Sequence, residues 1–283
     1  MSVNVDDDVP EPPFGDIEAL VDALAAAEAG VTLVTGKGGV GKTSVAVRIA
    51  AGLARRELPV HLANTDPAGR IPAPGGVDLP DTVTVSRIDP EAETERYAAK
   101  QLQATPADQR EHAAEDMRSP CTTEVAVFRA FSHLLGLGRT QHVVIDTAPT
   151  GHTLLLLDVT GAFHRQVMHD APVSHRSRMT TPLMRLQDPN FSRLILVALA
   201  ETTPVAEAAE LQADLRRAGI EPFGWVLNAV LAGTGTADPV LRARAHHEHA
   251  QLQRVTALAS RAWLARFDPV LAEHDLGAPA PSG

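Results

Sequence analysis

The stretch VTGKGGVGKTS, residues 34–44, holds two of the three lysines of this 283-residue chain, Lys37 and Lys42, in one glycine-rich run. The preceding residues, VTLVT (31–35), form a short apolar run of the kind that makes a buried strand. After the glycines, apolar residues between 45 and 53 recur at helical spacing. Strand, glycine loop and helix in this order, with the spacing Gly-x4-Gly-Lys-Thr, predict a phosphate-binding loop.

The residue types of this loop suit a nucleotide triphosphate. Glycines let the backbone turn sharply and direct successive N–H groups at phosphate oxygens, and the helix N-terminus adds partial positive charge. We expect Lys42 to contact the β- and γ-phosphates and the Thr43 hydroxyl to bind Mg²⁺. A glycine turn that only caps a helix is the alternative. The predicted ATP-binding residues of the loop are Gly36, Lys37, Gly38, Gly39, Val40, Gly41, Lys42, Thr43 and Ser44.

Lys37 is the unusual residue of the loop, because a lysine at this point leans away from the loop's own phosphate cradle. Phosphate-loop families that carry it are similar in using it across a dimer interface, against the partner's nucleotide. A compact ammonium on a flexible stem suits a contact that forms only when two subunits close. We therefore predict a face-to-face ATPase in which Lys37 is catalytic; a solvated loop lysine is the alternative.

Short apolar runs alternate with longer stretches along the rest of the chain, and most of these stretches are long enough for a helix. This alternation, with runs buried on both faces, predicts an α/β fold with a doubly wound, mostly parallel sheet flanked by helices. Together with this fold, the glycine-rich loop predicts a P-loop NTPase with a deviant Walker A motif, of the SIMIBI type. The expected strands after the first are VHLAN (60–64), VTVSRI (83–88), HVVID (142–146), RLILVALA (193–200), GWVLN (224–228) and WLARF (263–267).

Polar side chains follow several of these strands, at the sheet edge where ligands bind in such folds. Asp66 lies just past one strand and is expected to order the attacking water or a water on Mg²⁺. Asp146 ends another and is expected to hold Mg²⁺ directly or through water. Asn228 ends a third, where its amide has a donor and an acceptor for the adenine edge. For Asp66 and Asn228, an ordinary turn residue is the alternative.

Composition narrows the partners and the compartment. The formal charge of −10 and the absence of a basic run argue against nucleic acid as a partner. The longest apolar stretches fall short of the roughly 20 residues that cross a bilayer. The single cysteine, Cys121, agrees with a reducing compartment. We expect a soluble, cytoplasmic protein.

The chain is expected to form one large domain. Residues 1–15 are acidic and proline-rich, which predicts a flexible lead or linker. Residues 16–275 form the ATPase domain, with an inserted helical region at about 91–140, and residues 276–283 form a flexible tail.

Several stretches together resemble the arsenical pump-driving ATPase (ArsA) family, specifically the second of the two homologous halves that its typical members carry. The phosphate loop is shared with nitrogenase iron proteins, cell-division ATPases and factors that target tail-anchored proteins, whereas the other stretches narrow the resemblance. It runs from about residue 17 nearly to the end. The stretches are GKGGVGKTS (36–44), SRIDPEAETERY (86–97), MRSPCTTEVAVFRAFS (117–132), DTAPTGHTLLLLD (146–158), residues 186–220 and GWVLN (224–228).

The resemblance implies an ATPase that energises arsenite or antimonite export through a separate integral-membrane pump, to which it attaches peripherally. It places Ser119, Cys121 and His152 in the site that binds the metalloid and Asn228 against the adenine. Trivalent arsenic is soft and prefers thiolate sulfur, so Cys121 suits this role chemically. A small buried cysteine and a helix-capping histidine are the alternatives.

The family's first half, with its own phosphate loop and further cysteines, has no counterpart in this sequence. The chain therefore pairs with a second copy, pairs with a separate first-half ATPase, or is a fragment. Two other functions stay open: a targeting ATPase for tail-anchored membrane proteins, and a nucleotide-binding half that is idle without its partner. An iron protein takes two cluster cysteines from each subunit, which argues against that class.

Overall fold

The computed structural model describes residues 14–66, 71, 79–106, 120–148, 160–161, 180–234 and 238–267. In this part of the chain, one eight-stranded sheet has the order β1-β8-β7-β6-β2-β5-β3-β4, and every pairing in it is parallel. The strands are β1 (Gly15–Asp16), β2 (Val31–Thr35), β3 (Val60–Asn64), β4 (Thr84–Arg87), β5 (His142–Asp146), β6 (Ser192–Leu199), β7 (Gly224–Val230) and β8 (Ala262–Arg266).

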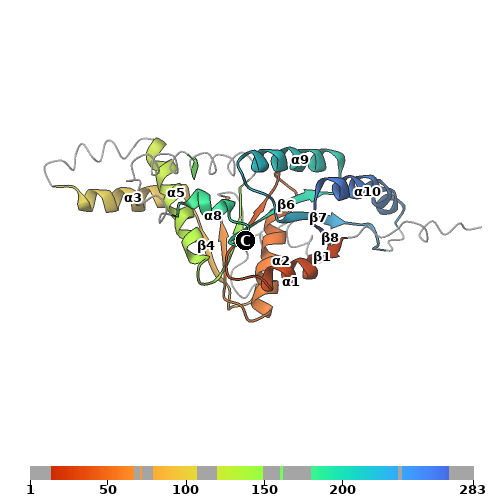
Figure 1. Ribbon diagram of the computed structural model, residues 1–283, viewed down its shortest axis with the longest axis horizontal. Coiled ribbons are helices and arrows are strands. Elements are labelled where there is room, and N and C mark those ends of the chain that lie inside the picture. The colour runs from red at the N-terminus through yellow and green to blue at the C-terminus, as the bar shows by residue number, and fades with distance from the viewer. Residues whose placement is uncertain are drawn as a thin grey trace, which may run out of the picture.

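Helices cover both faces of the sheet (Figure 1). Helices α1 and α2 bury their apolar side chains in one hydrophobic cluster, and α5, α8, α9 and α10 bury theirs in a second cluster on the opposite face. The predicted parallel, doubly wound α/β fold is confirmed. The helices are α1 (Ile17–Ala25), α2 (Lys42–Arg55), α3 (Pro90–Ala104), α5 (Pro120–Leu137), α8 (Pro182–Gln187), α9 (Thr202–Arg217) and α10 (Pro239–Leu258).

The central strand decides where a ligand can bind. Strand β2 lies between β5 and β6, so the chain builds the sheet outward from it in both directions. All five residues of β2 are buried, as expected for a parallel strand covered on both faces. The glycine loop leaves the carboxyl end of β2, at the point where the strand order reverses, which is the binding position in such sheets.

The structure differs from the predicted elements at three places. The short edge strand β1 pairs with Trp263 and Leu264. It was not predicted, because two residues are too few to show an alternating apolar pattern. Asp16 caps α1 by accepting a hydrogen bond from the N–H of Ala19 at 2.8 Å, and the helix ends at Ala25, whereas the residues from Asp16 to Gly30 predict a short helix over that whole range. Strand β7 continues past Asn228 through an irregular step.

The predicted domain boundaries stay predictions. Helices α3 and α5 pack against each other within the range expected for the helical insertion, and α3 has no buried residue. Gly15, at the end of the expected lead, already belongs to β1. The expected tail, 276–283, lies outside the described residues.

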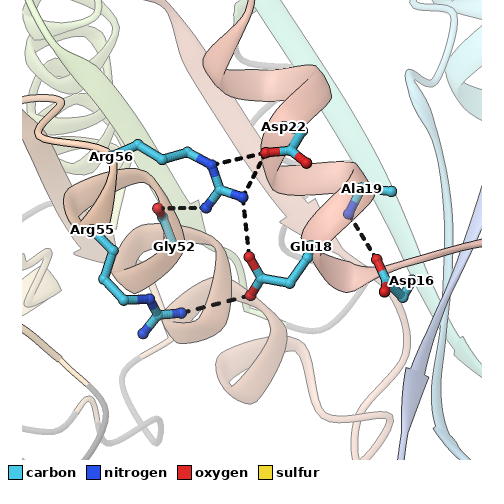
Figure 2. Close-up of polar contacts among 7 residues, drawn as sticks. All are labelled: Asp16, Glu18, Ala19, Asp22, Gly52, Arg55 and Arg56. Atoms are coloured by element: carbon cyan, nitrogen blue, oxygen red, sulfur yellow. Dashed lines mark hydrogen bonds and ion pairs between the residues drawn. The ribbon is translucent and has the colours of Figure 1, made fainter.

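Helices α1 and α2 are joined by a close contact and a polar network (Figure 2). The guanidinium of Arg56 donates to Asp22 and Glu18 of α1 and to the carbonyl oxygen of Gly52 in α2. A Cβ at Gly52 would lie 2.8 Å from Cγ1 of Val21. The absence of a side chain at Gly52 therefore sets how closely the two helices approach.

This contact predicts opposite effects for two helical glycines. Gly52→Ala should lower the free energy of unfolding by about 1–2 kcal/mol, because the new methyl group overpacks the helix contact. Gly136→Ala in α5 meets no atom within 4 Å and should raise stability by up to about 1 kcal/mol through helix propensity. Urea denaturation of both variants measures this, and a gain in stability for Gly52→Ala would refute the close contact.

Candidate functional site

The glycine loop packs directly against the ends of two neighbouring strands. Gly36 has φ +152°, and a Cβ there would lie 2.3 Å from the carbonyl oxygen of Val197 in β6. Gly41 has φ +85°, and its Cβ would lie 2.0 Å from Nδ2 of Asn228 in β7. Gly41 is also the N-cap of α2, and its position makes no side-chain cap hydrogen bond to the helix. The first N–H groups of α2 therefore follow directly on the loop without a capping side chain. The loop therefore has the backbone donors of an anion site.

Lys42 lies inside the loop, with only 7% of its surface exposed. Its Nζ donates to the carbonyl oxygen of Lys37 at 3.0 Å. Burial lowers the pKa of Lys42, while the charges of Asp146 and Asp66 oppose that shift. The ammonium is thus held over the loop and lies close to two carboxylates.

Thr43 and Asp146 form the second part of the site. The Thr43 hydroxyl donates to Oδ2 of Asp146 at 2.7 Å. Asp146 is 1% exposed, and among the described residues its Oδ1 has no hydrogen-bond partner. Burial raises the pKa of Asp146 to about 6, with the Thr43 hydrogen bond and the Lys42 charge acting in the opposite direction. A hydroxyl beside an unpartnered buried carboxylate oxygen fits the hard-oxygen ligands of Mg²⁺.

Asp66 lies near both of these groups, since its charge affects the pKa of Lys42 and of Asp146. Its backbone N–H donates to Oδ1 of Asn64 at 2.6 Å. Asn64 ends β3, is buried, and has no partner for Nδ2 among the described residues. Sequence reasoning missed Asn64, although its place two residues before Asp66, at a strand end, is typical of an Asx turn.

Lys37 lies in a different environment from Lys42. Its side chain is 54% exposed and its Nζ forms an ion pair with Glu207 of α9. No local pattern could have predicted this contact with Glu207, because the two residues are 170 positions apart. The predicted contact of Lys37 with a partner's nucleotide stays a prediction, and in this chain the ammonium is bound to α9.

Asn228 contacts the loop rather than standing apart from it. Its Nδ2 donates to the carbonyl oxygen of Val40 at 3.0 Å. The predicted contact with adenine stays a prediction. The site thus joins β2, β3, β5 and β7 through Lys42, Thr43, Asp66, Asp146 and Asn228.

The side chains predicted to bind the metalloid lie outside the described residues. Cys121 is in the first turn of α5, but its side chain is outside the described residues, as are Ser119 and His152. In the described ranges, no three histidine, cysteine, aspartate or glutamate side chains gather as a metal centre. The metalloid site therefore stays a prediction.

Comparison with known families matches this site to one of them. The family model described as an anion-transporting ATPase, ArsA, matches residues 30–184, which is more than half of the chain and includes the loop, Asp66 and Asp146. The chain belongs to the ArsA ATPase family. The resemblance read from the sequence is confirmed.

Curated members of the ArsA family are longer than this chain. It is 46% identical to an arsenical pump-driving ATPase of Escherichia coli over 94% of this chain and 46% of that protein. It is 47% identical to the arsenical pump-driving ATPase of Acidiphilium multivorum over 84% of this chain and 41% of that protein. The chain thus spans about half the length of these relatives.

A more distant relative is an ATPase of another name. The ATPase get3 of Schizosaccharomyces pombe is 21% identical over 80% of both chains. Within the described part of this ArsA family chain, none of the helices combines the length and apolar character needed to cross a membrane.

The buried carboxylate of Asp146 predicts a gain in stability when its charge is removed. The pKa of Asp146 is raised from 3.8 to about 6, so ionisation opposes folding. The penalty is complete above pH 6 and disappears as the pH falls toward 3.8. It corresponds to at most about 3 kcal/mol. Without Mg²⁺ and nucleotide, Asp146→Asn should therefore be more stable than the wild type at pH 8. At pH 5 this gain in stability should be smaller.

Urea denaturation in a chelating buffer at the two pH values measures this difference. Asp81→Asn is the matched control, because Asp81 is exposed and its substitution should change stability by less than about 0.5 kcal/mol. Lower stability of Asp146→Asn at pH 8 would show that the charge of Asp146 is compensated within the folded chain.

Proposed function

We propose that this chain binds and hydrolyses ATP with Mg²⁺, and that it does so as one half of an arsenite or antimonite export system. The observation that carries the proposal is the Thr43–Asp146 pair beside the glycine loop and the buried Lys42, with one carboxylate oxygen that has no partner among the described residues. The similarity to two arsenical pump-driving ATPases, each covered to about half its length, supports the export role.

The residues of the site have different roles in the proposed hydrolysis of ATP. Loop N–H groups and the start of α2 bind the phosphates, and Lys42 exchanges the carbonyl of Lys37 for phosphate oxygens. Thr43 and Asp146 hold Mg²⁺, which when bound neutralises charge on the β- and γ-phosphates. Asp66 orients the attacking water, because phosphoryl transfer depends mainly on positioning and charge stabilisation.

Lys37 completes the site from another subunit in this proposal. Its exposed ammonium leaves Glu207 and stabilises the charge on the partner's nucleotide. The exposed ion pair with Glu207 is worth at most about 1 kcal/mol, so a stronger contact to phosphate displaces it. The partner is a second copy of this chain or a separate first-half ATPase.

Metalloid binding links the reaction to export. We assign arsenite or antimonite to Ser119, Cys121 and His152, with Cys121 as the soft thiolate ligand. The metalloid favours the closed, hydrolysing arrangement because it binds that arrangement more tightly. The ATPase acts at the cytoplasmic side of an integral-membrane pump subunit.

A second candidate function is supported by the distant similarity to ATPase get3. In that case the chain is a targeting ATPase for tail-anchored membrane proteins. A hydrophobic tail-anchor peptide would then stimulate turnover while antimonite would not, which separates the two functions in one assay.

The trans role predicts different defects for the three lysines. Lys37→Ala should lower ATP turnover at least about 100-fold while magnesium-dependent ATP binding persists. Lys42→Ala should lose binding itself. Lys100→Ala, on exposed α3, is the matched control and should behave as wild type. Phosphate release and calorimetry measure the two quantities, and normal turnover by Lys37→Ala would refute the trans role.

The metalloid role predicts a selective loss. Cys121→Ser should abolish stimulation of ATP turnover by antimonite and leave the basal rate unchanged, because the hydroxyl replaces a soft ligand with a hard one. An antimonite titration of turnover, with the oligomer's mass measured in parallel, provides the readout. Stimulation that survives in Cys121→Ser would remove this residue from the metalloid site.

A further inference from the structure

On the basis of the proposed nucleotide site, we infer that Glu248, a buried carboxylate on α10, is a positioning residue that holds Asn228 against the phosphate loop. Through Asn228 it shapes the part of the site that receives the base of the nucleotide. Glu248 itself lies behind the site, on the helix that packs beside the ends of β6 and β7.

Glu248 holds the segment that leaves β7. Its side chain is 2% exposed, and its Oε2 accepts hydrogen bonds from the N–H groups of Leu231 and Ala232, both at 2.9 Å. Its Oε1 lies 3.9 Å from Nε of Arg244. One carboxylate oxygen thus joins two successive amides immediately after the strand.

The strand end that Glu248 holds is strained. Ala229 has φ +53°, a left-handed conformation that costs a residue with a side chain roughly 1 kcal/mol or more. At this point β7 shifts register against β8 between Asn228 and Val230. Such a bulge re-aims neighbouring side chains, and it persists only where the surroundings hold it.

Asn228 is the last residue of β7 in regular register before this bulge. Its Nδ2 donates to the carbonyl oxygen of Val40, in the middle of the phosphate loop. The chain of contacts therefore runs from Glu248, through the amides at 231 and 232 and the bulge, to Asn228 and the loop.

The same helix also holds the neighbouring strand end. Arg244 donates to Glu201 at 3.2 Å, and Gln251 donates to the hydroxyl of Thr202 at 3.2 Å. Both partners lie where β6 passes into α9. Because α10 anchors both loops, a change at Glu248 acts on the site through Asn228, whereas the hydrogen bond of Lys42 to the carbonyl oxygen of Lys37 involves no residue of α10.

A buried carboxylate is a costly way to pack a helix. Burial raises the pKa of Glu248, whereas the two amides and Arg244 stabilise its charge. An apolar side chain of similar size would fill the space at lower cost but would leave the buried N–H of Leu231 and the part-buried N–H of Ala232 without this partner. The carboxylate is thus suited to holding a backbone segment in place.

The experiment compares ATP with inorganic tripolyphosphate, which has the phosphates but no base. Glu248→Ala should weaken magnesium-dependent ATP binding at least about 10-fold and tripolyphosphate binding by less than about 3-fold. Glu248→Gln should restore ATP binding to within about 3-fold, because its amide oxygen can accept both N–H bonds. In an Asn228→Ala background, Glu248→Ala should have no further effect.

Gln212→Ala is the matched structural control. Gln212 lies on α9 and is also buried. Its amide donates to the carbonyl oxygen of Leu258, the last residue of α10, and accepts from the indole N–H of Trp225, near the start of β7. Both contacts lie at the other end of these elements from the residues that Glu248 holds. Gln212→Ala should be less stable than the wild type and should bind ATP and tripolyphosphate with wild-type affinity. If Glu248→Ala does not fold, Glu248→Asp replaces it, and its shortened carboxylate should weaken ATP binding at least about 3-fold.

Three outcomes would overturn the inference: wild-type ATP affinity in the folded Glu248 variant, equal losses for ATP and tripolyphosphate, or an undiminished effect in the Asn228→Ala background. A wild-type chain that binds no ATP with Mg²⁺ would instead refute the proposed function. The two failures are therefore distinguishable.

Discussion

The close approach of the glycine loop to the sheet is the constraint on which the rest of the site depends. At Gly36 and Gly41 an added Cβ would collide with Val197 and Asn228. The loop therefore lies flat on the ends of β6 and β7, with α2 starting at its far side. Any side chain at these positions would lift the loop and separate its amides from Thr43 and Asp146.

Buried charge is the second element of the site. Lys42, Asp146 and Asp66 lie close enough to interact electrostatically, and burial disfavours the charged forms of Lys42 and Asp146. Among the described residues, Oδ1 of Asp146 has no hydrogen-bond partner, and burial raises the pKa of this carboxyl group, so these residues do not fully compensate its charge. A bound cation would supply the missing compensation in the proposed site.

Local patterns in the sequence were sufficient for the fold and for the centre of the site. The strand runs, the glycine spacing and the aspartates at strand ends depend on neighbouring residues, and they predicted β2, the loop and Asp146. Glu207 and Glu248 were missed because their roles depend on contacts that fold topology creates, whereas Asn64 was missed despite a local Asx-turn pattern. Strand β1 was missed because two residues carry no periodic signal.

The two loop lysines show how one short motif serves two environments. Lys42 starts α2, so its side chain turns back over the loop, where burial and two carboxylates fix it. Lys37 precedes the turn, and its side chain leaves the loop and reaches α9. Because α9 begins at the loop that α10 anchors through Thr202 and Glu201, the position of Glu207 depends on the same helix that holds Asn228. The segment that follows β7 and the loop that leads into α9 are thus both hydrogen-bonded to α10.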